Sequence, residues 1–368
     1  MLNQMQPVLP STRIRSENQL EPNLEVKRPG RLHALDGLRL AAALMVVIYH
    51  YTARGGGWST PVKDIFPETF RISSYGYLGV QLFFIISGFV ICMSAWDRPV
   101  KAFFVSRVIR LYPAYWFGVI ATSVTVAVIP GGRNHLAWND ILTNLTMLQQ
   151  PLRVPSVDTV YWTLYTELRF YLLFALVAWW GLTYKRVLLF CCVWGAATVI
   201  VTKAPAGPLK TLLIPEYSWF FIAGMAFYLM YRFRPNLMLF GVVGVSFCAS
   251  LASTFEEAKA LTWLGPRAGW PVIVILASFF VVMSLIATGK LSRIQWKWLP
   301  IAGALTYPVY LLHQVIGWEF ISYYAPRGVD PWVLVGTLTA GSLVLAYLVH
   351  KLVEKPVSRY LKRNLAQL

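Results

Sequence analysis

The stretch that decides the fold is residues 35–54, which read LDGLRLAAALMVVIYHYTAR. Its middle is apolar and uncharged, and its length matches the roughly 20 residues that a helix needs to cross a bilayer. Comparable apolar stretches follow along the chain, separated by short loops with Pro or Gly, at 75–96, 102–129, 158–180, 187–202, 210–231, 236–253, 270–288, 299–323 and 331–350. The pattern predicts an all-α polytopic integral membrane protein with about ten transmembrane helices.

The composition agrees with this fold class. Of 368 residues, 57% are hydrophobic and 13% are charged, whereas an average soluble domain has about 45–50% and about 25%. These values exclude an ordinary soluble domain and a disordered chain. The four Cys residues lie in apolar runs without metal-binding spacing, so neither a disulfide framework nor a metal site is expected.

The net charge of +17 reflects topology. With the N-terminus placed inside, the inner segments hold 21 Lys and Arg and the outer loops hold 10. This bias predicts that both termini are cytoplasmic, and it removes the support for nucleic-acid binding. We expect a flexible cytoplasmic tail at 1–31, a transmembrane domain at 32–357 and a cytoplasmic C-terminal tail at 358–368.

Ionisable residues within apolar spans are costly and by default mark functional sites. Arg39 and His50 lie eleven positions apart on one predicted helix, which places both on nearly the same face about 16 Å apart along its axis. Taken singly, Arg39 is a membrane-edge cation and His50 a hydrogen-bonded core residue. The pair together favours a functional column.

Arg107 and Arg110 begin the predicted helix 102–129 and are one turn apart, so they share a face. Two guanidinium groups at the inner membrane boundary are suited to bidentate phosphate binding. The alternative is plain anchoring by the positive-inside rule, and the spacing alone favours that alternative.

Glu167 lies about 8 Å inside the outer end of its predicted helix, and His50 lies about 6 Å inside the outer end of its own. The two side chains are therefore expected at one level. A carboxylate beside an imidazole orients the ring and raises its basicity, as a general base requires. The alternative is a structural ion pair of Glu167 with Arg169 or Arg39.

The predicted helix 299–323 carries a polar stripe of Tyr307, Tyr310 and Gln314, with His313 beside it. The stripe indicates a polar cavity. Interhelical hydrogen bonds around a kink at Pro308 explain it equally well. Glu216 and Glu319, near the outer side, suit either acceptor binding or loop capping, and the sequence does not decide between the two. It assigns no role to Arg169.

Six segments resemble, in chain order, the motifs of the membrane-bound acyltransferase 3 family, bacterial enzymes that O-acylate surface sugars. They are 35–39 with His50, 79–90, 104–113 with Arg107 and Arg110, 162–171 with Glu167, 307–313, and 354–356. Thr163 and Thr306 stand where the family often has Ser. Many relatives also carry a C-terminal hydrolase-like extracellular domain, which we do not expect here.

The resemblance implies a multi-pass enzyme of the bacterial inner membrane. Such an enzyme moves an acyl group, by default acetyl, from cytoplasmic acyl-CoA to a hydroxyl of a carbohydrate or other cell-envelope acceptor. His50 and Glu167 would be catalytic, and Arg39, Arg107 and Arg110 would bind the CoA. Substrate contacts are expected from Asp36, Trp162, Tyr307, Tyr310 and His313.

A secondary transporter or flippase is the alternative function, with the same charged residues acting as an ion or proton relay. Inverted repeats would favour it, and the sequence shows no clear internal repeat. The expected partners of the enzyme are acyl-CoA, a lipid-linked or free glycan acceptor and the lipid bilayer.

Overall fold

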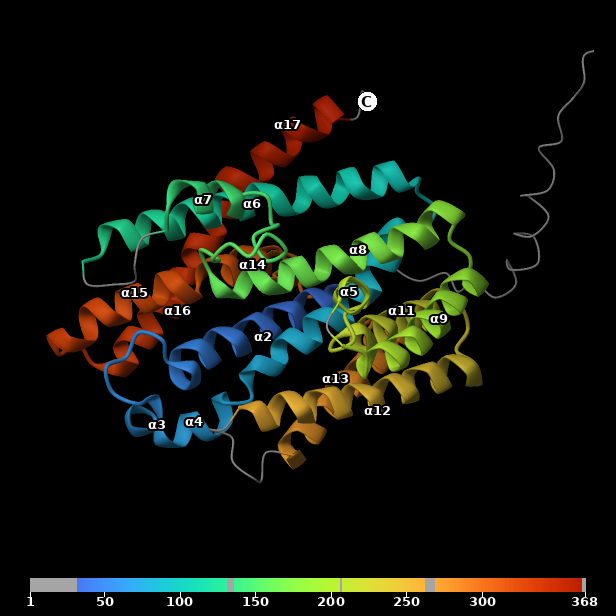
Figure 1. The fold of residues 1–368 in the computed structure, drawn as a ribbon, viewed down its shortest axis with the longest axis horizontal. Coiled ribbons are helices and arrows are strands. Elements are labelled where there is room, and N and C mark those ends of the chain that lie inside the picture. Colours follow the sequence, from blue (N-terminus) through green and yellow to red (C-terminus); the bar gives the residue numbers. More distant parts are fainter. Residues whose placement is uncertain (1–31, 131–135, 206, 262–268, 366–368) are drawn as a thin grey trace, which may run out of the picture.

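The computed structural model describes residues 32–130, 136–205, 207–261 and 269–365, and the regular elements in these ranges are helices. Figure 1 shows the long ones lying side by side in one bundle. Their bounds are α2 His33–Tyr49 with a π turn His50–Arg54, α3 Val62–Ile65, α4 Pro67–Ser73, α5 Gly79–Ala95, α6 Val100–Val128, α7 Trp138–Asn144, α8 Trp162–Trp180, α9 Tyr184–Thr202, α10 Pro208–Leu213, α11 Ser218–Arg232, α12 Leu237–Ala260, α13 Gly269–Ala287, α14 Leu299–Leu312, α15 Gln314–Tyr324, α16 Pro331–Val349 with a π turn His350–Glu354, and α17 Lys355–Leu365. The all-α prediction is confirmed.

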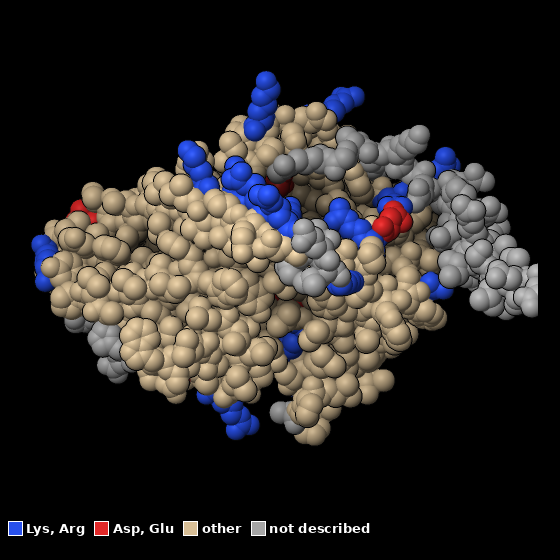
Figure 2. Space-filling view, turned by 90° about the horizontal axis from the view of Figure 1, so that it is seen from above, with Lys and Arg blue, Asp and Glu red and all other residues tan. Residues whose placement is uncertain are grey.

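The described residues contain eight helical stretches that are long and apolar enough to cross a membrane, and the bent pair α14–α15 makes a ninth if it counts as one span. The helix α8, which corresponds to the predicted span 158–180, carries Glu167 and Arg169 and is not one of these stretches. Large apolar side chains lie on the bundle surface, among them Ile120, Val124, Leu176, Val193, Ile200 and Val281. In Figure 2 a broad uncharged surface covers much of the molecule. This surface suits a polytopic membrane protein.

The two ends of the bundle are named here by the helices that lie at them. The α17 end is the one where α2 and α6 begin and from which α17 extends (Figure 1). The α3–α4 end is the opposite one, where α3, α4 and α7 lie. We expect the α17 end to face the cytoplasm, because the predicted inner segments gather there.

Two helix boundaries differ from the prediction. The stretch 210–231 is divided into the short α10 and the longer α11 by a turn at Ile214, whose φ of 54° is left-handed. The stretch 236–253 is too short, because α12 continues to Ala260. Those two extra turns bring Glu257 onto a helix that packs in the bundle.

The predicted helix 299–323 is broken between α14 and α15 by 59°, and this bend lies at His313, five residues after Pro308, which lies inside α14. Side chains from other parts of the chain form hydrogen bonds with backbone groups at the break. Asp158 Oδ2 accepts from the Val315 N–H at 3.0 Å. Tyr51 Oη donates to His313 O at 2.7 Å. The break is thus fixed by tertiary hydrogen bonds.

The backbones of α5 and α11 approach each other closely. A Cβ atom added to Gly88 would collide with Phe221 O, and one added to Gly224 would collide with Ile85 O. Small residues that let two backbones approach are typical of helix pairs in membranes. The Gly-containing run 79–90 therefore has the packing role that its composition indicates.

Candidate active site

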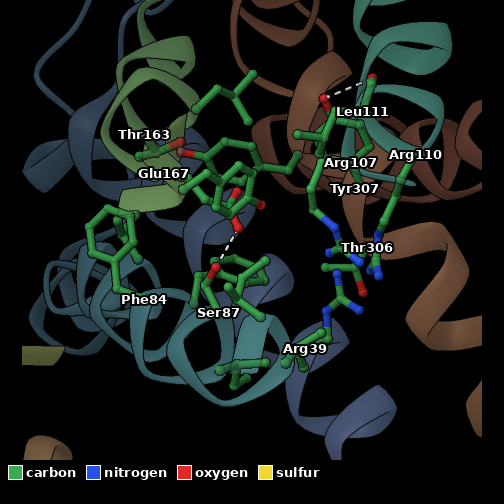
Figure 3. A pocket seen from close by; sticks show the side chains of 18 residues that line it. Arg39, Phe84, Ser87, Arg107, Arg110, Leu111, Thr163, Glu167, Thr306 and Tyr307 are labelled. Carbon is green, nitrogen blue, oxygen red and sulfur yellow. Dashed lines mark hydrogen bonds between the residues drawn. The ribbon is translucent and has the colours of Figure 1, made fainter. Parts of the chain in front are cut away.

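Three arginines meet inside the bundle near the α17 end. Arg39 comes from α2, Arg107 and Arg110 come from α6, and their guanidinium groups point toward one another in Figure 3. Arg107 is only 8% exposed. Within the described ranges, no carboxylate forms a salt bridge with any of the three. Arg39 is half-buried and Arg110 is exposed. Because three adjacent positive charges repel one another, this arginine cluster is suited to hold an anion.

A narrow cavity of about 100 Å³ extends from the arginine cluster into the bundle, and we call it the inner pocket. Ser87 on α5 donates a hydrogen bond to the Glu167 carboxylate across it (Figure 3). Tyr171, one turn after Glu167 on α8, lies beside the same carboxylate. The pocket therefore has a cationic mouth and an acidic, hydroxyl-bearing wall.

A wider cavity of about 770 Å³ lies at the α17 end, and we call it the vestibule. It shares Arg39, Arg110, Val90 and Tyr307 with the inner pocket, so the two cavities adjoin. Basic side chains dominate its remaining charged lining, which consists of Arg98, Lys355, Arg359 and Lys362 against Asp36 and Glu354. A cleft lined mainly by one sign of charge attracts ligands of the opposite sign.

Two histidines meet deeper in the bundle. His50 is the first residue of the π turn that follows α2, and His313 is the residue at which α14 and α15 separate. The His313 Nε2 atom lies 3.0 Å from His50 Nδ1. Trp318 packs edge-on to the His50 ring and donates from Nε1 to His50 O at 3.0 Å.

Backbone carbonyls fix the tautomers of this histidine pair. His313 Nδ1 lies 3.1 Å from Val309 O and 2.9 Å from Tyr310 O, so the proton belongs on Nδ1 and Nε2 is an acceptor. His50 Nδ1 lies between two acceptors, Val46 O at 2.9 Å and His313 Nε2. It therefore carries the proton of its own ring. The lone pair of His50 then sits on Nε2, as a general base requires.

The expected pair of His50 and Glu167 is not formed. The ring of His50 is held by Val46 O and His313, whereas Glu167 is held by Ser87 and lies on the side of the arginine cluster. Equal depth along two helices does not make neighbours, because the side chains point in different directions around their axes. In this structure His313 takes the orienting position that the sequence assigned to Glu167.

Tyr310 joins the inner pocket to the histidine pair. Its ring lines the pocket and lies 5.8 Å, centroid to centroid, from the ring of His313. Its hydroxyl accepts from Thr163 Oγ1 at 2.9 Å and donates to Val160 O at 3.2 Å. The arginine cluster, inner pocket and histidine pair therefore follow one another from the α17 end toward the α3–α4 end.

The remaining expected site residues have separate positions. Tyr307 lines both cavities and donates to Leu111 O at 3.1 Å (Figure 3). Asp36 lies in the vestibule against Gly303. Trp162 is not among the lining residues of either cavity, and its ring packs on Tyr217 at 5.1 Å.

Arg169 is a structural residue. Its guanidinium donates to Thr211 O at 2.5 Å and to Thr166 Oγ1 at 2.9 Å, and it lies over the ring of Tyr165. These contacts tie α8 to α10. The ion pair of Arg169 with Glu167, which the sequence left open, is not formed.

Sequence reasoning missed Asp158. It is fully buried, and its Oδ1 accepts from the Val160 N–H at 3.0 Å while Oδ2 binds the start of α15. Its place directly before Thr159 is the signal that identifies it, because Asp is a preferred helix-capping residue. Asp158 thereby fixes the backbone on which His313 sits.

The comparisons with known proteins agree with an acyl-transfer site. The family model described as an acyltransferase domain matches residues 32–351. The chain is 27% identical to acyltransferase MdmB of Streptomyces mycarofaciens, over 91% of this chain and 93% of that protein. No solved structure matches the chain significantly.

Two further relatives have names that mention a process or a reaction. Exopolysaccharide production protein ExoZ of Rhizobium meliloti (strain 1021) is 28% identical over 77% of this chain and 90% of that protein. O-acetyltransferase OatA of Staphylococcus aureus is 25% identical over 90% of this chain, which spans 58% of that longer protein.

Proposed function

The chain belongs to the acyltransferase family whose domain model matches residues 32–351, and from that membership we propose that it moves an acyl group, acetyl in the simplest case, from acyl-CoA to a hydroxyl of a carbohydrate or other cell-envelope acceptor. One observation carries the donor assignment. Three guanidinium groups without carboxylate partners among the described residues stand where a basic vestibule meets a narrow pocket. A phosphate-bearing donor supplies the missing counter-charge.

The dimensions of the site suit a long, thin donor with a charged head. The vestibule, at about 770 Å³, accommodates a nucleotide, and the inner pocket, at about 100 Å³, accommodates a slender arm. Arg39 and His50 are separated by eleven residues of helix, which is about 16 Å along the axis. A pantetheine arm spans this distance, so the thioester reaches the level of the histidine pair while the phosphates stay at the arginine cluster.

Glu167 has a role on the donor side in this proposal. Its carboxylate and the Ser87 hydroxyl line the inner pocket beyond the arginine cluster. A carboxylate accepts hydrogen bonds and repels phosphate. Glu167 therefore accepts an amide N–H of the pantetheine arm and keeps the phosphates on the vestibule side.

His50 is the general base. Its Nε2 takes the proton from the acceptor hydroxyl as that oxygen bonds to the thioester carbonyl carbon. The carbon–sulfur bond then breaks, and the proton on Nε2 passes to the CoA thiolate, which leaves as the thiol. His313 is a positioning residue that keeps the His50 Nδ1 proton in place, since its Nε2 lies 3.0 Å from that atom.

The orientation follows from the donor. Acyl-CoA is made inside the cell, so the vestibule and α17 face the cytoplasm in this proposal, and the protein lies in the bacterial inner membrane. The Lys and Arg residues that line the vestibule also agree with the positive-inside rule. The acceptor then reaches the histidine pair from the side of the α3–α4 end.

The test compares two thioesters with the purified protein in lipid nanodiscs. Acetyl-CoA and acetyl-pantetheine carry the same acyl group, but only acetyl-CoA carries phosphates. We expect release of free thiol from acetyl-CoA, and a much higher KM for acetyl-pantetheine. Equal KM values would contradict the role of the arginine cluster. Ion-gradient-driven uptake without any thioester consumption would instead establish the transporter alternative.

A further inference from the structure

A second polar cluster lies toward the α3–α4 end, outside the arginine cluster and the histidine pair. Glu257 on α12 accepts a hydrogen bond at 2.9 Å from the Nε2 atom of Gln81 on α5. Tyr49, Tyr77 and Tyr217 are its electrostatic neighbours, from the end of α2, the turn before α5 and the turn before α11. Three other segments of the chain, namely α5 with the turn before it, the end of α2 and the turn before α11, thus lie around the Glu257 carboxylate.

Two atoms of this cluster are buried without a partner. The Tyr77 hydroxyl and the Gln81 Oε1 atom have no hydrogen bond in the described part of the chain. Tyr77 is 7% exposed and Gln81 is 1% exposed. A buried polar atom left unpaired destabilises the fold, so such atoms call for a specific explanation. Here one donor-acceptor hydroxyl and one acceptor oxygen stand beside a carboxylate, a set suited to bind hydroxyl groups.

The cluster is connected to the histidine pair by aromatic contacts. The ring of Tyr49 lies 6.0 Å from that of Tyr77 and 5.1 Å from that of His50, centroid to centroid. On the other side, Tyr217 lies 5.1 Å from Phe84, which lines the inner pocket, and 5.1 Å from Trp162. The polar cluster therefore adjoins both the base and the donor pocket, and the aromatic rings beside it offer apolar faces to a ligand.

We propose that Glu257, Gln81 and Tyr77 form the acceptor-binding site, and that they recognise a molecule with two neighbouring hydroxyl groups. The inference rests on the proposed acyl transfer and names the residues that hold its acceptor. One hydroxyl donates to the Glu257 carboxylate, and the other donates to Gln81 Oε1 and accepts from the Tyr77 hydroxyl. The bound acceptor presents a further hydroxyl toward His50, past the ring of Tyr49, which contacts both Tyr77 and His50.

The experiment measures acetyl transfer from acetyl-CoA to two probe alcohols in nanodiscs. Methyl β-D-glucopyranoside carries neighbouring hydroxyls, and cyclohexanol carries a single one. We expect Glu257→Gln to raise the KM for the glucoside by about tenfold or more, and Tyr77→Phe to raise it by about fivefold, from the loss of a charged and a neutral hydrogen bond. The KM for acetyl-CoA and the rate with cyclohexanol should stay unchanged.

A matched control separates binding from folding. Ser246→Ala removes another buried hydroxyl of α12 without a described partner, about 16 Å along the helix from Glu257. It should leave both KM values unchanged. Tyr77→Phe should keep or raise the thermal midpoint, because it removes an unpaired buried hydroxyl. A structural role alone predicts no selective change in the KM for the glucoside.

The outcomes distinguish the two proposals. The acceptor site is overturned if both variants keep the wild-type KM for the glucoside, or if they change the KM for acetyl-CoA equally. Turnover of acetyl-CoA that the glucoside never stimulates overturns the diol class and leaves the acyltransferase proposal standing. A wild-type protein that neither binds nor consumes acetyl-CoA overturns both. If Glu257→Gln does not fold, Tyr77→Phe alone decides.

Discussion

The arginine cluster and the histidine pair differ in whether the protein itself supplies partners for their polar groups. Arg39, Arg107 and Arg110 bring three positive charges together, and no described carboxylate pairs with them. His50 and His313 are neutral rings whose Nδ1 atoms face backbone carbonyls, with their shared contact closed at 3.0 Å. The first region is incomplete without a ligand, whereas the second is complete without one.

In the proposed mechanism this difference matches the task of each region. A site that binds an anion keeps its charges unpaired so that the ligand provides the partner. A base must already have the correct tautomer when the acceptor arrives, so the backbone holds it in advance. Substitutions should therefore affect ligand affinity at the arginine cluster and turnover at the histidine pair.

The largest effect is expected from His50→Ala. Loss of the general base should lower kcat by about 10²- to 10⁴-fold, with the KM for acetyl-CoA nearly unchanged. Turnover in nanodiscs measures this effect. His33→Ala is the matched control, since His33 lies at the start of the same helix and lines neither cavity. Wild-type turnover in His50→Ala would remove the histidine pair from the mechanism.

Arg107→Ala should act on affinity. Loss of a charge-assisted hydrogen bond should raise the KM for acetyl-CoA by about 10- to 100-fold, while acetyl-pantetheine should be used as before. Titration of both thioesters checks this split. The control is Arg232→Ala, whose arginine is paired with Asp97 at 2.9 Å outside both cavities. A fall in kcat at constant KM would contradict the role of Arg107 in binding acetyl-CoA.

His313→Leu should lower kcat by about tenfold, because His50 loses a hydrogen bond that fixes its tautomer. His313→Gln restores an acceptor and should recover part of the loss. A steady-state comparison of the two variants measures this rescue. Identical rates in both variants would assign His313 to packing alone, since leucine and glutamine are similar in size.

The smallest effect is expected from Glu167→Gln. Its carboxylate binds Ser87 and makes no described contact with His50. The KM for acetyl-CoA should therefore rise by only about fivefold, because the glutamine amide still accepts a hydrogen bond but carries no charge. The pH profile of kcat should match that of the wild type. A shifted profile would show that Glu167 acts through His50 after all, as the helix depths alone suggested.

Periodic features of the sequence were sufficient for the helices and for part of the site. Apolar length predicts the long helices, and the one-turn spacing predicts that Arg107 and Arg110 share a face. Parts of the helices without an apolar repeat could not be predicted from the sequence. The apolar pattern of α12 stops near residue 253, but the helix continues to Ala260. Its polar last turns carry Glu257, which contacts Gln81 inside the bundle.

The sequence by itself determined the all-helical class and identified the ionisable residues that must be shielded from lipid. Both can be read from the local sequence, since they depend on the length of each apolar run and on the charges within it. Only the tertiary structure decided which of these residues meet. Asp158 and Tyr51 fix the break that turns His313 toward His50, and Ser87 draws Glu167 away from it. Rotation about a helix axis is set by neighbouring helices, so depth along a helix does not specify a partner.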